Sequence, residues 1–188
     1  MIRTQPPSPD ALARLIEAGT GPTRPTEGPE VPCGDFEMRI ARDGTWYYRD
    51  TPILRPALCK LFASVLRRDA AGDYWLVTPV ERGRIVVEDA PFLAVELAER
   101  TGAQGPELVF RTNLDEWVTA DADHPIRVEN RAESGEPAPY VRLRPGLEAK
   151  LARPVFYQLV ELAEERGGRL FVASAGVEFD LGSVTGAG

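Results

Sequence analysis

Cysteine and histidine, which often carry catalysis or bind metals, are scarce in this chain of 188 residues, which has two cysteines and one histidine. Cys33 and Cys59 lack the C-x-x-C spacing of a zinc site, so no metal centre is expected. No cofactor is expected either, because no G-x-x-x-x-G-K-[ST] phosphate loop is present. A nucleophile elbow, which would present a catalytic serine, is also missing. His124 is therefore the one candidate for acid–base chemistry by a histidine.

Long runs of one kind of residue are missing as well. No stretch of Lys and Arg could follow a phosphate backbone, and the net charge of −7 disfavours DNA or RNA as a partner. No apolar stretch approaches the roughly 20 residues of a membrane-spanning helix, and "MIRTQPPSPD" lacks the apolar core of a signal peptide. A cytoplasmic protein with reduced thiols and no membrane contact is expected.

The pentapeptide VELAE occurs twice, at Val95–Glu99 and at Val160–Glu164. Tryptophans, Pro-Ile pairs and Tyr-to-Pro segments precede both copies in the same order, which indicates an internal duplication and two small lobes. The first copy alternates as a half-buried strand does, whereas the second lies in a helical pattern. We therefore expect Val95–Glu99 to form a strand and Val160–Glu164 to be helical.

The first part of the chain mixes helical and extended patterns. Ser8 is a suitable N-cap for a short amphipathic helix, and a Pro/Gly linker follows up to residue 32. "GDFEMRI" alternates as a strand does, Asp43-Gly44 predicts a hairpin, and "RPALCKLFASVLRR" has one apolar helical stripe. Residues 1–32 are thus predicted to be a helix and linker, and residues 33–82 an N-terminal α+β lobe.

From Asp73 onward, seven short strand-like runs follow one another, separated by turn residues. Antiparallel hairpins are the natural connection at these spacings. A helix over Pro154–Arg166 is predicted to close the sheet. The fold class is therefore α+β, with a C-terminal lobe over residues 83–181 built as a bent antiparallel sheet, and a tail at 182–188.

Polar and aromatic residues near the landmarks of the repeat are candidates for ligand binding. Arg suits phosphate or carboxylate, aromatic rings suit planar groups, and pockets favour domain interfaces, so a cleft between the lobes is expected. Core packing for the aromatic residues and ion pairs for the arginines are the structural alternatives. The candidates are Trp46, Tyr48, Arg55, Thr78 and Glu81 in the first half, and His124, Arg142, Glu148, Arg153 and Tyr157 in the second.

A family resemblance is carried by the stretch from "CGDFEMRIARDGTWYYRDTPILRPALCKLFASVLRR" to "FLAVEL", and by "DADHPIRVEN", "PYVRLRPGLEAKLARPVFYQLVELA" and "SAGVEFDLG". Together these segments resemble the proteobacterial family called domain of unknown function 1285. The resemblance implies a two-part fold of repeated motifs whose C-terminal half is similar to pleckstrin-homology domains. It also implies a nucleotide-like ligand between the halves and a role in signalling, and it carries over no catalytic activity, because none is assigned to the family.

Residue types and resemblance together predict a non-catalytic protein of bacterial signalling or stress response that binds a small nucleotide-like anion. Arg55, Arg142 or Arg153 would hold the phosphate, and Trp46, Tyr48 or Tyr157 would flank the base. One alternative is a small enzyme that uses His124 with Glu81 or Glu148. Another is a protein-interaction adaptor without a small ligand, and a protein partner stays open in every case.

Overall fold

The structure is a computed structural model that describes residues 7–18, 33–130 and 135–183. The chain divides into two compact units, Met1–Asp89 and Ala90–Gly188. The sequence predicts a lobe boundary after residue 82. The strand Arg82–Val87 spans that position and pairs within the sheet of the first unit.

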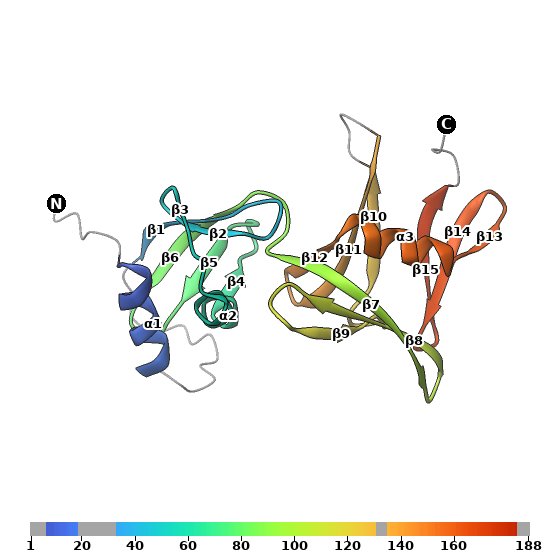
Figure 1. Ribbon diagram of the computed structural model, residues 1–188, viewed down its shortest axis with the longest axis horizontal. Helices are drawn as coiled ribbons and strands as arrows, with labels where there is room; N and C mark the ends of the chain where they lie inside the picture. The colour runs from blue at the N-terminus through green and yellow to red at the C-terminus, as the bar shows by residue number, and fades with distance from the viewer. Residues whose placement is uncertain (1–6, 19–32, 131–134, 184–188) are drawn as a thin grey trace. The chain divides into compact units, whose positions relative to one another are not determined.

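The first unit is a six-stranded sheet with two helices (Figure 1). The strand order is β3-β2-β1-β6-β5-β4, and the central pair β1–β6 is parallel while the other neighbours are antiparallel. Its elements are α1 (Pro9–Ala18), β1 (Cys33–Ile40), β2 (Trp46–Tyr48), β3 (Thr51–Pro52), α2 (Pro56–Ser64), β4 (Leu66–Arg68), β5 (Tyr74–Val77) and β6 (Arg82–Val87).

The local sequence explains why these elements form. The Ser8 hydroxyl accepts a hydrogen bond from the Ala11 amide at 3.3 Å, as expected for the N-cap of α1. Gly44, with φ of 83°, closes the β1–β2 turn, which confirms the predicted hairpin. Pro56 begins α2, where its missing N–H costs nothing.

The core of the first unit lies on one face of the sheet. Helix α2 buries Leu58 and Phe62, and α1 contacts α2 through the side that carries Leu12 and Ile16. The Trp46 ring lies 6.0 Å from the Phe62 ring, centroid to centroid. The helices lie on one face of the sheet (Figure 1). The residues of β5, β6 and β1 that point to the other face are half-buried or exposed.

The second unit has a six-stranded sheet of order β10-β11-β12-β7-β8-β9 and a three-stranded sheet β13-β14-β15. Strand β14 contacts β8, and β15 contacts β10, so the smaller sheet meets the larger one at two strands. Its elements are β7 (Phe92–Gly102), β8 (Gly105–Thr112), β9 (Trp117–Thr119), β10 (Ile126–Asn130), β11 (Pro137–Arg144), β12 (Leu147–Leu151), α3 (Arg153–Glu161), β13 (Glu164–Arg166), β14 (Arg169–Ser174) and β15 (Val177–Ser183).

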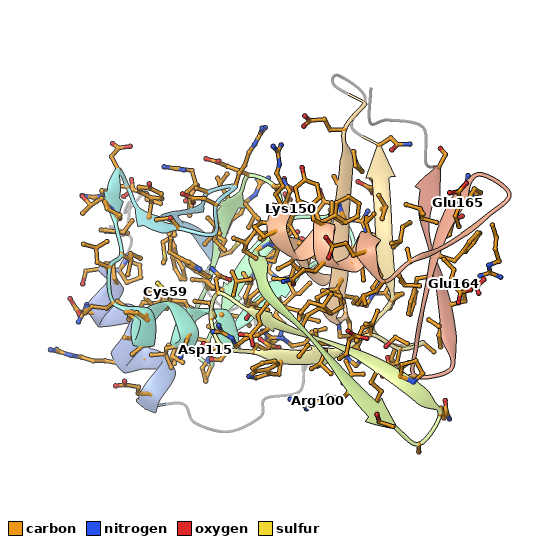
Figure 2. All side chains as sticks on the ribbon, turned by 45° about the vertical axis from the view of Figure 1, so that its right-hand side comes forward. Cys59, Arg100, Asp115, Lys150, Glu164 and Glu165 are labelled. Atoms are coloured by element: carbon orange, nitrogen blue, oxygen red, sulfur yellow. The ribbon has the colours of Figure 1, made fainter. Side chains whose placement is uncertain are left out.

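For this unit one prediction is confirmed and three are corrected. Val95–Glu99 lies in β7, as the alternation predicted. The helix predicted over Pro154–Arg166 ends at Glu161, and Glu164 and Glu165 lie on strand β13, which pairs with β14 (Figure 2). The sheet is mixed rather than wholly antiparallel, because β12 and β7 pair in parallel at its centre. Helix α3 also does not end the fold, since three strands follow it.

Candidate ligand-binding site

The face of the first sheet that its helices do not cover carries four arginines. Successive side chains of a strand point to opposite faces, and directly paired residues share a face. Trp75 on β5 pairs with Arg67 on β4 and with Arg84 on β6. We call this surface the arginine face and define it by Arg39, Tyr47, Arg67, Trp75, Arg82 and Arg84.

Trp75 lies in a fixed position on the arginine face. Its Nε1 donates a hydrogen bond to Asp69 Oδ2 at 2.8 Å. This bond, followed by the backbone N–H of Asp73, lowers the pKa of the Asp69 carboxyl below its ordinary value. The Arg82 guanidinium lies 4.8 Å from the centre of the Trp75 ring, within the range of a cation–π contact.

Two of the four arginines of the arginine face are neutralised by carboxylates. Arg84 Nη2 lies 2.5 Å from Asp73 Oδ1. At the other end of the face, Arg39 pairs with Glu88 at 2.6 Å and covers the Tyr47 ring at 4.2 Å. Within the described residues, the Arg82 guanidinium contacts the Trp75 ring and forms no ion pair. Arg82 is thus a cation whose charge is available beside an aromatic ring.

The predicted candidates of the first unit have structural partners of their own. Trp46 is 1% exposed in the core, and the Arg49 guanidinium covers the ring of Tyr48 at 5.2 Å. Arg55 precedes α2 and pairs with Asp10 of α1 at 2.5 Å, which ties the two helices together.

Thr78 and Glu81 form the turn between β5 and β6. The Thr78 hydroxyl donates to the Glu81 carbonyl at 2.8 Å and accepts the Glu81 amide at 3.1 Å. This pair of hydrogen bonds fixes the turn. It thereby sets the register that brings Trp75 and Arg84 together on the arginine face.

His124 lies in the loop between β9 and β10, beside a carboxylate that the sequence analysis did not name. Its Nδ1 is 3.0 Å from Asp121 Oδ1, and the same oxygen accepts the amides of Asp123 at 2.9 Å and His124 at 2.8 Å. Burial raises the pKa of Asp121, but the hydrogen bonds from His124 and Asp123 outweigh it, so the net direction is down. The arrangement orients the imidazole and also stabilises a turn.

Arg142 and Glu148 are brought together as neighbours on β11 and β12. The Glu148 carboxylate, however, is held by Arg127, whose Nε and Nη2 donate to it at 2.7 and 2.6 Å. Arg127 also pairs with Glu129 and covers the ring of Tyr140 at 4.4 Å. The hydrogen bond to Glu148 raises the pKa of Arg127 further. Glu148 is therefore committed to an ion pair.

Arg153 and Tyr157 lie one turn apart on α3, and the Tyr157 side chain is 58% exposed. A second exposed aromatic residue is Trp117 on β9, 46% exposed, with Arg100 at 5.6 Å and Arg111 at 5.9 Å from its ring centre. Arg100 lies on the long β7–β8 hairpin (Figure 2). Trp117 and Arg100 thus give the second unit a pair of the same residue types as Trp75 and Arg82.

Sequence reasoning missed Trp75, Arg82 and Arg84 as site residues. In "DYWLVTP" both faces of the strand carry large apolar or aromatic residues, so alternation alone does not say which face is outward. "ERGRIVV" does contain a signal, because Arg82 and Arg84 alternate with Gly83 and Ile85. Only the β5–β6 register then places Trp75 beside Arg84.

The described residues contain no group of three or more His, Cys, Asp or Glu residues arranged to hold a metal ion. None of their helices combines the length and the apolar character that crossing a membrane requires.

Two units, each mostly sheet with few helices, define a β-rich protein of two domains. The chain belongs to the DUF1285 family: residues 28–90 match its N-terminal domain, described as a domain of unknown function, and residues 91–181 match its C-terminal domain. This confirms the family predicted from the sequence. The two matches meet between residues 90 and 91, next to the division of the structure after Asp89.

Two solved structures of the same family are similar to this chain. A DUF1285 family protein from Silicibacter pomeroyi is 42% identical, with a TM-score of 0.84, over 96% of this chain and 97% of the other. One from Shewanella baltica is 30% identical, with a TM-score of 0.53, over 66% of this chain and 90% of the other. No curated protein matches the sequence.

Proposed function

We propose that this protein is a non-catalytic binding protein for a small, planar, nucleotide-like anion, and that it works in bacterial signalling or stress response in the cytoplasm. The observation that carries the proposal is Trp75 with the Arg82 guanidinium 4.8 Å from its ring centre, at the surface of the first unit. An aromatic ring and a cation without a carboxylate partner are the two groups that a base and a phosphate need.

The charge balance of the arginine face favours one small anion over a long polyanion. Asp73 and Glu88 already neutralise two of its arginines, Arg84 and Arg39. A nucleic-acid backbone needs several available cations in a row, and the described part of this face does not supply them. The expectation that DNA and RNA are not partners therefore stays part of the proposal.

The ligand-binding residues proposed here differ from most of those expected from sequence. Trp46 is buried and Arg55 is paired with Asp10, so Trp75 and Arg82 take the roles of base-stacking and phosphate-binding residues in the first unit. Tyr157 and Arg153 on α3, with Arg142 on β11, are the alternative set in the second unit. Each set can be tested by substitutions within one unit.

We also propose that the fold arose by internal duplication and that the second unit is similar to pleckstrin-homology domains. The order of three strands, a helix and three strands occurs as β1–β2–β3–α2–β4–β5–β6 and again as β10–β11–β12–α3–β13–β14–β15. Strands β1 and β6 are neighbours, β10 contacts β15, and an Arg-Pro pair stands at the start of both helices. Bent hairpins around a helix support the pleckstrin-homology likeness of the second unit.

This equivalence differs from the one that the repeated pentapeptide suggested. The first copy, Val95–Glu99, lies in β7, which precedes the second set of three strands. The second copy begins in α3 and ends in β13. The support for duplication therefore comes from the order of elements, and the two VELAE copies occupy elements that do not correspond.

An enzyme that uses His124 is the second candidate function, and the observation that favours it is the contact of 3.0 Å to Asp121. A histidine oriented by a carboxylate is the usual arrangement of a general base. If the protein turns over a substrate, and His124→Gln abolishes this activity without unfolding the protein, the enzyme proposal would replace the binding proposal. A protein-interaction adaptor would instead use the exposed Trp117 and Tyr157.

Thermal-shift measurements against a panel of nucleotides and cyclic nucleotides test the binding proposal. A ligand present at about a hundred times its Kd stabilises the folded state by about 2.7 kcal/mol. We expect this stabilisation in the wild type and a large loss of it in Arg82→Ala. Arg100→Ala is the matched control, because Arg100 covers the ring of Trp117 in the second unit. An equal shift in Arg82→Ala, or no shift with any nucleotide, would contradict the proposal.

Tryptophan fluorescence gives a second readout, since the chain has three tryptophans and Trp46 is buried. The ligand should quench emission in Trp117→Phe, where Trp75 remains the surface tryptophan. Quenching should be lost in Trp75→Phe. The reverse pattern would move the site to the second unit.

A further inference from the structure

We propose that the ion pair between Arg84 and Asp73 restricts the ligand of the arginine face to a single phosphate group, so that nucleoside monophosphates bind at least as tightly as diphosphates and triphosphates. This inference rests on the proposed function and adds which nucleotide class the site accepts. It assigns Asp73 the role of a specificity-determining residue that acts through Arg84.

Arg84 is a second cation beside Arg82, but its charge is neutralised by Asp73. Arg82 and Arg84 are two residues apart on β6 and share a face, which sets their Cα atoms about 7 Å apart. Both side chains therefore lie within reach of a chain of phosphates on a ligand stacked at Trp75. Arg82 forms no ion pair within the described residues, whereas Arg84 Nη2 is 2.5 Å from Asp73 Oδ1.

Asp73 is held in place by the turn between β4 and β5. Its amide donates to Asp69 Oδ1 at 2.9 Å, and its carbonyl accepts the Asp69 amide at 3.0 Å. Asp69 in turn accepts the Trp75 Nε1 hydrogen bond. The carboxylate that neutralises Arg84 is thus anchored to the same residues that fix the aromatic ring.

A second phosphate at Arg84 would have to displace this carboxylate. Asp73 would then lie unpaired beside the added negative charge, and like charges at contact distance repel. Asp35, which is paired with Arg84 across β1 and β6, adds a further carboxylate on the same row. At Arg84, each additional phosphate therefore gains no available cation and meets one or two carboxylates.

The test is a titration of adenosine, AMP, ADP and ATP at fixed ionic strength without divalent cations, followed by Trp75 fluorescence in the Trp117→Phe background. We expect AMP to bind about tenfold more tightly than adenosine, because Arg82 contacts its phosphate. ADP and ATP should bind no more tightly than AMP.

Asp73→Asn should reverse this order, because it releases Arg84 for a second phosphate. ATP should then bind about three- to tenfold more tightly than to the parent protein, while AMP changes little. The gain should vanish in the double variant Asp73→Asn with Arg84→Ala. Asp180→Asn is the matched control, since Asp180 pairs with Arg169 at 2.6 Å in the second unit with similar exposure.

The outcomes separate this inference from the function on which it rests. Nucleotide binding with ATP tighter than AMP in the parent protein, or with no gain for ATP in Asp73→Asn, would overturn the inference and leave the binding function standing. Absence of binding by AMP, ADP and ATP alike would overturn the inference, and absence of a thermal shift with every nucleotide of the panel would overturn both. If circular dichroism showed that Asp73→Asn did not fold, Asp73→Ser would replace it. This variant must likewise bind ATP more tightly than the parent protein does, with little change for AMP.

Discussion

Trp46 and Trp75 lie on opposite faces of the first sheet, and this decides what each can do. Trp46 is 1% exposed and packs on Phe62, so its loss would open a cavity in the core. Trp75 lies at the surface, with its indole N–H on Asp69 and its ring under Arg82. At the scale of single residues, the arginine face therefore has a half-buried aromatic ring that is rigidly held beside a cation without an ion pair.

Trp75→Phe is expected to raise the pKa of Asp69 toward its ordinary value, because the largest cause of the depression is the hydrogen bond from Trp75. A carboxyl with a depressed pKa stabilises the fold above its unfolded pKa of about 3.9, and this stabilisation is lost as the pH falls through the folded pKa. The measurement is an NMR titration of the Asp69 side chain between pH 2 and 6. An unchanged pKa in Trp75→Phe would show that the backbone amides alone cause the shift.

Gly83 is expected to tolerate no side chain, because a Cβ atom there would lie 2.2 Å from the Phe36 ring. Gly83→Ala would force the ring or the strand to move, at a cost of about 1–3 kcal/mol in the free energy of unfolding. Gly34, its direct partner across β1 and β6, has nothing within 4 Å of such an atom. Urea denaturation should show a clearly larger loss for Gly83→Ala than for Gly34→Ala, and similar losses would contradict this account.

At the scale of elements, both later helices end sooner than their apolar periodicity predicts. Helix α2 stops at Ser64, and Leu66–Arg68 pairs with β5 as strand β4. Helix α3 stops at Glu161, and Glu164–Arg166 pairs with β14. In each case the strand partner is supplied by a segment further along the chain, and pairing with it overrides local helix propensity.

Local patterns therefore predicted where helices and strands occur better than how they pair. The alternation of Leu93, Val95 and Leu97 identified β7, and Asp43-Gly44 identified the first hairpin. The strand Leu147–Leu151 was not predicted, since "LEAKL" resembles a helix in composition. The two parallel pairs could not be predicted either, because each joins strands that are far apart in the sequence.

Ser174→Ala is expected to loosen the contact between the two sheets of the second unit. The buried Ser174 hydroxyl accepts the Leu108 amide at 2.8 Å and donates to the Ala120 carbonyl at 2.6 Å. Alanine would leave both backbone groups without this partner, at a cost of about 1–3 kcal/mol in the free energy of unfolding. The control is the exposed Ser64, whose replacement by Ala should cost far less. Chemical denaturation distinguishes the two, and hydrogen exchange at Leu108 should increase only in Ser174→Ala.

At the scale of the whole molecule, the negative charge is distributed unevenly. Residues 1–89 contain 12 basic and 13 acidic residues, a net charge of −1, whereas residues 90–188 contain 10 and 16, a net charge of −6. A small anion is therefore repelled less by the first unit than by the second. This distribution agrees with a phosphate site at Arg82 and makes Arg142 or Arg153 the less favourable choice for the phosphate.

Separate fragments of residues 1–89 and 90–188 test where the ligand binds. Each unit has its own buried core, so both fragments are expected to fold, the shorter one with lower stability because small domains bury less surface. Trp75, Arg82, Arg84 and Asp73 all lie in the first fragment, and AMP should therefore raise the Tm of that fragment alone. A shift in the second fragment would favour Arg142, Arg153 and Tyr157 instead. A shift that appears only in the intact chain would mean that residues of both units bind the ligand, which is the arrangement that the sequence and the family resemblance first predicted.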